Sequence, residues 1–150
     1  MPRIAIVKLP EYVTKEEVRR VCKKLKLRDW TKIKAPKISL KEAKIVLKQI
    51  DSAGLKIDPE QFRSGLAVEF EHGTRFKQAN VTNNHPVLTG MIVLAHMLET
   101  LDYYMRLDVT EIEERLFNAV AAKSIEQIRM NSQKAIEARI VLAKAEARNL

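Results

Sequence analysis

The chain has few of the residues that end, bend or cross-link a polypeptide. Its single cysteine, Cys22, excludes an internal disulfide and a cysteine cluster, and we expect this thiol to face the core. Only four of its 150 residues are glycines, and neither glycine nor proline occurs after Gly90. It also lacks a Gly-x-Ser-x-Gly sequence, a Walker loop and a dinucleotide-binding fingerprint. These absences argue against a covalent hydrolase and against the common nucleotide-binding folds.

Long hydrophobic runs are also absent. No apolar run reaches about 18 residues, so we expect no membrane-spanning segment. The start, Met-Pro-Arg-Ile-Ala-Ile-Val-Lys, is too short in apolar residues for a signal peptide. The expected location is therefore the cytoplasm, or a phage particle if a phage encodes the protein. With 46% hydrophobic residues, the chain can build the core of one globular domain.

Positive charge is concentrated in the first third of the chain. Residues 1–50 contain 15 Lys or Arg against 5 Asp or Glu, whereas residues 51–150 contain 12 against 14. The densest cluster lies on one short predicted helix and its exit, and consists of Arg19, Arg20, Lys23, Lys24, Lys26 and Arg28. Such a cluster could bind a polyanion such as nucleic acid through phosphate contacts. A solvated lysine-rich face explains the same charges, and no known nucleic-acid motif accompanies them.

Start and stop signals predict an all-α protein, a compact bundle of four to five helices with a short extended N-terminal arm and a long C-terminal helix. Thr14 with Glu17 and Ser39 with Glu42 have capping-box spacing, and Asp58-Pro59 is typical of a helix start. We expect the third helix to end at Gly73 and a polar loop to follow it. Ile4 and Ile6 between Pro2 and Pro10 suggest the extended arm.

Charge and pattern divide the chain into three parts within one globular domain. Residues 1–38 form a basic arm and helix, residues 39–109 a helical core, and residues 110–150 a long helix that Thr110 with Glu113 could cap. Every third or fourth residue of that helix is uncharged, along an assembly seam that includes Phe117, Ala121, Ile128, Ala135 and Leu142. Small residues on the seam permit close helix packing, against the protein's own body or a neighbouring subunit.

Two mirrored pairs of histidine and glutamate suggest a metal site. Glu69 with His72 and His96 with Glu99 are each three residues apart, so each pair shares a helix face. Together with Asp102, imidazole and carboxylate groups could hold one divalent transition metal.

The position of these pairs in their helices leaves an alternative open. His72 lies at the end of its predicted helix, whereas His96 lies ten residues beyond Pro86, so a simple hairpin would keep them about 15 Å apart. The same side chains could instead satisfy one another in a structural hydrogen-bond network, which is the more common use of such pairs.

Several motifs resemble a family of small proteins of unknown function that occur in bacteria and tailed phages. They are Phe62-Arg63-Ser64-Gly65, Glu69-Phe-Glu-His-Gly73, Asn80-Val-Thr-Asn83, Pro86, Thr89-Gly90, Ala95-His96, Glu99 and Asp102-Tyr-Tyr-Met-Arg-Leu107. The resemblance covers about residues 43–113. It implies no activity, but the residues matching the family pattern are Glu71, His72, Gly73, Asn80, Thr82, His96, Glu99, Asp102 and Tyr103. His85 stands where the family usually has an acidic residue.

These observations favour a non-enzymatic assembly or accessory protein. The Pro-flanked basic arm resembles the docking arms of phage structural proteins, and arm and last helix lie outside the family resemblance. We therefore expect a homo-oligomer or a larger protein assembly, with nucleic acid as a further candidate partner and no membrane.

A metal-dependent hydrolase of phosphorylated substrates is the alternative. The Glu99-x-x-Asp102 pair resembles the magnesium-binding helices of all-α nucleotide pyrophosphatases, although His72 stands where those have a carboxylate.

Overall fold

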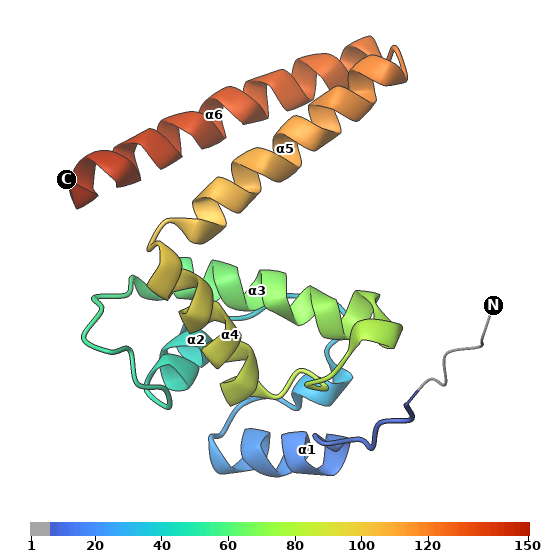
Figure 1. Ribbon diagram of the computed structural model, residues 1–150, viewed down its shortest axis with the longest axis vertical. Helices are drawn as coiled ribbons and strands as arrows, with labels where there is room; N and C mark the ends of the chain where they lie inside the picture. The colour runs from blue at the N-terminus through green and yellow to red at the C-terminus, as the bar shows by residue number, and fades with distance from the viewer. Residues whose placement is uncertain (1–6) are drawn as a thin grey trace. The chain divides into compact units, whose positions relative to one another are not determined.

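The computed structural model describes residues 7–150, and every regular element in that range is a helix. The elements, in chain order, are α1 (Lys15–Lys24), the 3₁₀ helix η1 (Trp30–Lys32), α2 (Leu40–Leu47), α3 (Pro59–Arg75), the 3₁₀ helix η2 (Lys77–Ala79), α4 (Pro86–Glu99), α5 (Tyr103–Ala121) and α6 (Ile125–Asn149) (Figure 1). The all-α prediction is confirmed for this range, with six α-helices instead of four to five. Pro2, Ile4 and Ile6 of the predicted arm lie outside the described residues.

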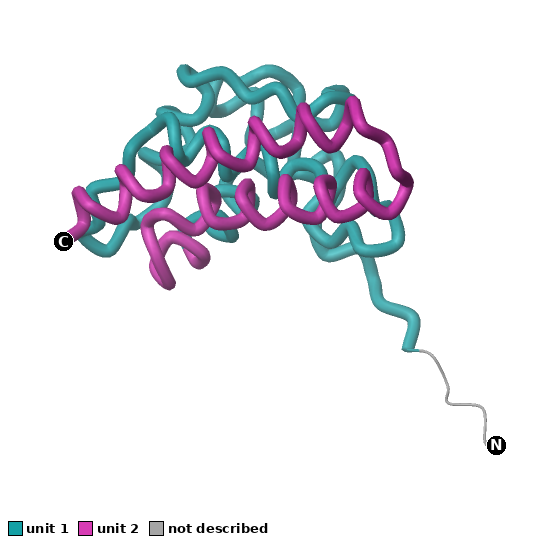
Figure 2. The backbone as a smooth tube through the Cα atoms, turned by 90° about the horizontal axis from the view of Figure 1, so that it is seen from above, with its two compact units in different colours: residues 1–94 teal, residues 95–150 magenta. Residues whose placement is uncertain are grey.

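The chain divides into two compact units, one ending at Leu94 and the other beginning at Ala95 (Figure 2). The boundary falls inside α4, so the last turn of this helix belongs to the second unit. From the sequence we expect three segments, 1–38, 39–109 and 110–150, which are defined by charge and by the helix pattern. The two units are defined by contacts within the structure, so they do not test that division. That division stays a prediction.

The predicted helix starts are confirmed where a side chain caps the backbone. Ser39 accepts a hydrogen bond from the Glu42 backbone N–H, and the Glu42 carboxylate accepts one from the Ser39 backbone N–H, which completes the capping box of α2. Thr14 caps α1 and Asp58 caps α3 through the same kind of bond. Side-chain oxygens at these positions satisfy backbone donors that have no partner within the helix. α3 continues two residues past its expected end at Gly73.

The core of the first unit forms around one tryptophan. Trp30 in η1 is almost fully buried and packs edge to face on Phe70 of α3, with ring centroids 5.5 Å apart. The other fully buried core side chains include Val18, Cys22, Val46, Phe62, Leu66 and Val93. Burial raises the pKa of the Cys22 thiol, as expected for a core-facing cysteine. These contacts join helices that are far apart in the sequence.

A buried carboxylate joins the exit of α1 to η1 and α2. Glu42 accepts hydrogen bonds from Arg28 at 2.9 and 2.7 Å, from Ser39, and from the Trp30 indole at 3.4 Å. Burial by itself raises the pKa of Glu42, but the bonds from Arg28 and Ser39 outweigh it and lower the pKa to about 2. Glu42 therefore stays ionised and fixes the segment between α1 and α2.

The loop before α4 is held by its own side chains. Asn83 donates to the Val13 carbonyl at 2.6 Å and to Glu11 at 2.7 Å, so it anchors the segment that precedes α1. His85 accepts a hydrogen bond at Nδ1 from the Leu88 N–H and caps α4. Burial lowers the pKa of His85, which favours the neutral ring that this cap needs.

The second unit is an antiparallel hairpin of α5 and α6, preceded by the end of α4. A long C-terminal helix is present as α6, but its expected start at Thr110 is wrong, because residues 122–124 end α5 and the chain reverses before α6 begins at Ile125 (Figure 1). Lys123 adopts a left-handed conformation with φ of +53°, and the Ser124 N–H donates to the Ala119 carbonyl, a glycine-type helix end built without glycine. The predicted cap at Thr110 is also wrong: it lies inside α5, and its hydroxyl donates to the Arg106 carbonyl.

Candidate functional site

The first mirrored pair forms a contact within α3. The Glu69 carboxylate lies 3.0 Å from His72 Nδ1, as their three-residue spacing predicts. The Glu69 side chain is buried, whereas the His72 side chain is 60% exposed. The pair therefore joins a buried carboxylate to an imidazole at the surface of the first unit.

The second pair is arranged differently. The His96 ring stacks on Tyr103, with centroids 4.2 Å apart and planes within 10°, and meets Tyr104 edge to face. Glu99 is exposed at the end of α4. His96 thus belongs to an aromatic cluster that joins the end of α4 to the start of α5. This cluster explains why two consecutive tyrosines begin α5.

Asp102 is held by neighbouring side chains at the start of α5. Arg106 donates to both of its carboxylate oxygens at 2.9 Å, and the Thr100 hydroxyl donates to Oδ1 as well. The Arg106 guanidinium lowers the pKa of Asp102, with a further contribution from Thr100, against the opposing effect of burial. Both oxygens are therefore engaged in the turn between α4 and α5.

The five predicted metal ligands fall in different units. Glu69 and His72 belong to the first unit, and His96, Glu99 and Asp102 to the second. Among residues 7–150, no group of three or more His, Cys, Asp or Glu side chains is placed to hold a metal ion. A divalent transition metal bound by these residues stays a prediction.

The predicted polyanion cluster is partly neutralised by its own neighbours. Arg20 forms a two-bond contact with Glu17, Arg19 lies 3.4 Å from Glu16, and Arg28 is paired with buried Glu42. The remaining members, Lys23, Lys24 and Lys26, are exposed at the C-terminal end of α1. Lys26 has a φ of +57° and ends α1 in the same way as Lys123 ends α5. The cluster is therefore less positive than the sequence alone indicates.

The predicted assembly seam is used mostly inside the chain. In α6, Ala135 is buried and Ile128 and Leu142 are half-buried, on the side that packs against α5. Arg106 with Glu146, and Arg139 with Glu113, form ion pairs that join the two helices. Phe117 and Ala121, which precede the break, are exposed. Intramolecular packing therefore accounts for most of this seam.

A second apolar stripe runs along the side of α6 away from the seam. Ile125, Ile136 and Ile140, which are 82%, 61% and 50% exposed, lie on it, and Ala143 and Ala147 continue it; Arg129 and Ser132 interrupt it between the first two isoleucines. Phe117 on α5 adds a 72% exposed aromatic side chain to the same hairpin. In the sequence this stripe is visible as apolar residues spaced three, four and eleven positions apart. It becomes a candidate binding surface only in the structure, because α5 covers the seam side of α6 and leaves the stripe exposed.

Residues 18–113 match the family described as protein of unknown function (DUF5661). The chain belongs to this family. The DUF5661 match begins at residue 18, whereas the motifs in the sequence indicated a resemblance from about residue 43. The match therefore also includes the basic cluster and Trp30. The match ends at Glu113, inside α5, and leaves out α6. No curated protein and no solved structure shows a significant match.

None of the helices in residues 7–150 has the length and hydrophobicity needed to cross a bilayer.

Proposed function

We propose that this protein is a non-enzymatic accessory protein that assembles by self-association of its α5–α6 hairpin. The exposed stripe of Ile125, Ile136 and Ile140 is the observation that supports the proposal. Two helices can bury only the faces that meet each other, and the remaining apolar surface of α6 is exposed to water. Burying such a stripe is favourable, and a four-helix bundle is a common arrangement that does so.

A second copy of the chain is the partner that fits this stripe best. In an antiparallel pairing centred between Ile136 and Ile140, each copy would place Ile136 against Ile140 of the other. One surface can therefore serve both sides of a two-fold interface. Charges beside the stripe have both signs, such as Glu126, Glu137 and Lys144, so two copies do not repel each other.

The hairpin supports this role better than the N-terminal arm does. Glu11 and Val13, near the end of the predicted arm, contact Asn83 of the same chain. Docking through residues 1–6 concerns residues that the structure does not describe, and it stays a prediction. A place in a phage particle likewise stays a prediction.

The metal-dependent hydrolase receives less support from the geometry. A carboxylate that holds a catalytic metal needs a free oxygen, and both carboxylate oxygens of Asp102 already accept hydrogen bonds from Arg106 or Thr100. The three arginines of the basic cluster likewise have acidic partners, which weakens the nucleic-acid alternative.

Size-exclusion chromatography with light scattering tests the proposal directly. Across a concentration series, we expect the wild-type chain to reach twice the monomer mass. Ile136→Glu should return it to the monomer mass, because a glutamate at the centre of the interface would be buried against Ile140 of the other copy. Val81→Glu, at a 76% exposed position of the first unit, is the matched control and should still dimerise.

Two results would contradict the proposal. One is a wild-type chain that stays monomeric at the highest concentration reached. The other is an Ile136→Glu variant that dimerises as well as the wild type. Circular dichroism of each variant shows whether its helices are intact, so that a loss of mass is not confused with unfolding.

A further inference from the structure

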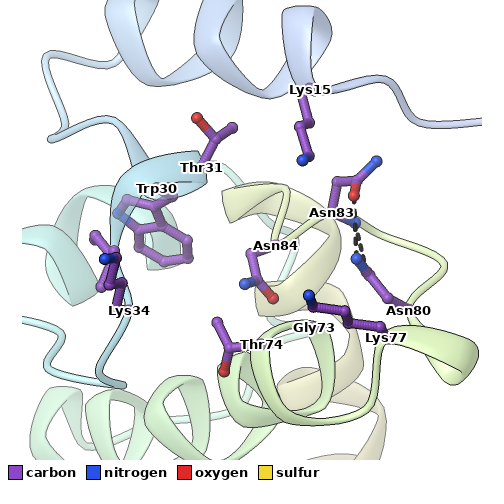
Figure 3. Close-up of a pocket in the computed structure, with 11 residues that line it drawn as sticks. Lys15, Trp30, Thr31, Lys34, Gly73, Thr74, Lys77, Asn80, Asn83 and Asn84 are labelled. Carbon is purple, nitrogen blue, oxygen red and sulfur yellow. Dashed lines mark hydrogen bonds between the residues drawn. The ribbon is translucent and has the colours of Figure 1, made fainter.

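The first unit contains a pocket whose charged lining residues are all lysines. Its volume is about 670 Å³, and side chains from α1, η1, α3, η2 and the loop before α4 line it (Figure 3). Lys15, Lys34 and Lys77 contribute three ammonium groups, and Thr31 and Thr74 contribute hydroxyls. No acidic residue lines it, and within residues 7–150 none of the three lysines forms an ion pair. Three like charges facing one concave surface favour an anionic ligand.

An unsatisfied amide lies in the middle of this pocket. Asn84 is only 6% exposed, and its Oδ1 has no hydrogen-bond partner among the described residues. Figure 3 shows its carboxamide between the lysines, beside Gly73 and Thr74. A buried carbonyl oxygen without a donor costs about 1–3 kcal/mol, so native proteins usually pair such an oxygen with a protein group, a water molecule or a bound ligand. Because this oxygen packs against Gly73, a hydroxyl or amine donor of a bound group would satisfy it only once the carboxamide has turned toward the pocket.

The loop that carries Asn84 is fixed before any ligand arrives. Asn80 accepts from the Asn83 N–H at 2.9 Å and donates to the Asn83 side chain at 3.0 Å, as the dashed lines in Figure 3 show. The Thr82 hydroxyl accepts from the Asn84 N–H at 3.2 Å. These bonds keep Asn83 and Asn84 in left-handed conformations, with φ of +47° and +57°. Preorganisation of this kind lowers the entropic cost of binding.

We propose that this pocket binds a small phosphomonoester. The phosphate would lie among Lys15, Lys34 and Lys77, because ammonium groups bind phosphate as point charges and the threonine hydroxyls can donate to its oxygens. Ile33, half-buried at the wall of the pocket, offers an apolar contact for the organic part, with the buried Trp30 ring behind this wall. Asn84 would bond a hydroxyl or amine of that part. The volume is within the range of ligand pockets for molecules of nucleotide size.

This site is separate from the hairpin that carries the proposed assembly. All of its lining residues belong to the first unit, and they do not include the exposed arginines and lysines at the C-terminal end of α1. Binding and self-association can therefore be tested independently of each other.

The only tryptophan of the chain lines the pocket and reports on it directly. Trp30 fluorescence would be followed while inorganic phosphate, adenosine monophosphate or citrate is titrated into the full chain at constant ionic strength. Isothermal titration calorimetry gives the affinity independently. We expect a saturable change with adenosine monophosphate, a weaker one with inorganic phosphate, and none with chloride at the same ionic strength.

Charge reversal at one lysine tests where the ligand binds. Lys77→Glu should weaken adenosine monophosphate binding at least tenfold. Lys41→Glu is the matched control, because Lys41 is exposed on α2 outside the pocket and the substitution changes the net charge equally. It should change the affinity less than twofold. Asn84→Asp should also weaken binding, since aspartate tolerates the left-handed backbone but adds a negative charge next to the phosphate.

The outcomes separate the proposal from its competitors. Saturable binding of adenosine monophosphate that Lys77→Glu weakens and Lys41→Glu does not would support the phosphomonoester site. Equal affinity for inorganic phosphate would overturn it, because phosphate alone would then be recognised. No saturable binding of either phosphate compound would overturn it, as would tighter binding of citrate. Equal weakening by the two lysine variants would also overturn it, because binding would then depend only on net charge.

Discussion

Gly73 of α3 and Asn84 of the following loop lie so close that position 73 has no room for a side chain. A Cβ at residue 73 would come within 2.0 Å of Asn84 Oδ1 and 2.6 Å of Asn84 Cγ. The need for glycine here comes from this contact and not from the backbone, because Gly73 has no positive φ. The missing side chain of one residue makes the space that the carboxamide of the other fills.

Gly73→Ala should therefore destabilise the protein. Alanine inside a helix normally stabilises by up to about 1 kcal/mol relative to glycine, but the clash with buried Asn84 should reverse the sign. We expect a net loss of about 1–2 kcal/mol in the free energy of unfolding, measured by urea denaturation. Adding Asn84→Gly removes the clashing atoms, and glycine suits the φ of +57°, so the double variant should recover most of the loss. A more stable Gly73→Ala variant would contradict this contact.

Glu42 should make stability depend on pH in the acid range. Its pKa is about 2 in the folded chain against an ordinary value of 4.5. The stabilisation is complete above about pH 4.5 and is lost as the pH falls toward 2, because the unfolded chain takes up the proton first. The difference corresponds to about 3 kcal/mol.

Urea denaturation between pH 6 and pH 2.5 measures this dependence. Glu42→Gln should destabilise the protein at pH 6 and make the curve flatter, since the titrating group is absent. Glu60→Gln removes only an exposed ion pair with Arg63 and should cost less than about 0.5 kcal/mol at pH 6. An unchanged slope in Glu42→Gln would show that Arg28 and Ser39 do not lower the pKa of this carboxyl.

Lys123→Gly should stabilise the hairpin. Lys123 has a φ of +53° at the end of α5, a conformation that costs an ordinary residue about 1 kcal/mol and glycine very little. We expect a gain of about 0.5–1 kcal/mol in the free energy of unfolding. Lys123→Ala removes the charge but keeps the strained backbone, so it should gain nothing. If α5 and α6 formed one continuous helix, Lys123→Gly would instead destabilise by about 1 kcal/mol.

The contact of Arg106 with Asp102 should contribute far more to the free energy of unfolding than its contact with Glu146 does. The Asp102 side chain is 4% exposed, whereas that of Glu146 is 45% exposed. Arg106→Ala would remove the charged partner of this buried carboxylate, and we expect a loss of about 2 kcal/mol. Glu146→Gln breaks only the exposed pair and should cost less than about 0.5 kcal/mol. Similar losses for both variants in thermal or urea unfolding would contradict this difference.

Local chemistry made much of the first unit predictable. The starts of α1, α2 and α3 follow from capping residues that lie within three positions of the backbone groups they satisfy. The contact between Glu69 and His72 follows from helical spacing in the same way. The end of α5 was missed because Lys123 adopts a conformation usually reserved for glycine, and a lysine carries no signal for such a turn.

Three features can be predicted from residues that are close together in the chain: its helical nature, the starts of its first helices, and the concentration of positive charge in its first third. Each of these depends on residues within one or two turns of one another. The reversal of the last helix onto α5 could not be predicted in this way, because it depends on burying the face of Ala135 against α5. The same holds for the position of Lys15, Lys34 and Lys77 around one amide, because segments far apart in the sequence meet only when the core around Trp30 forms.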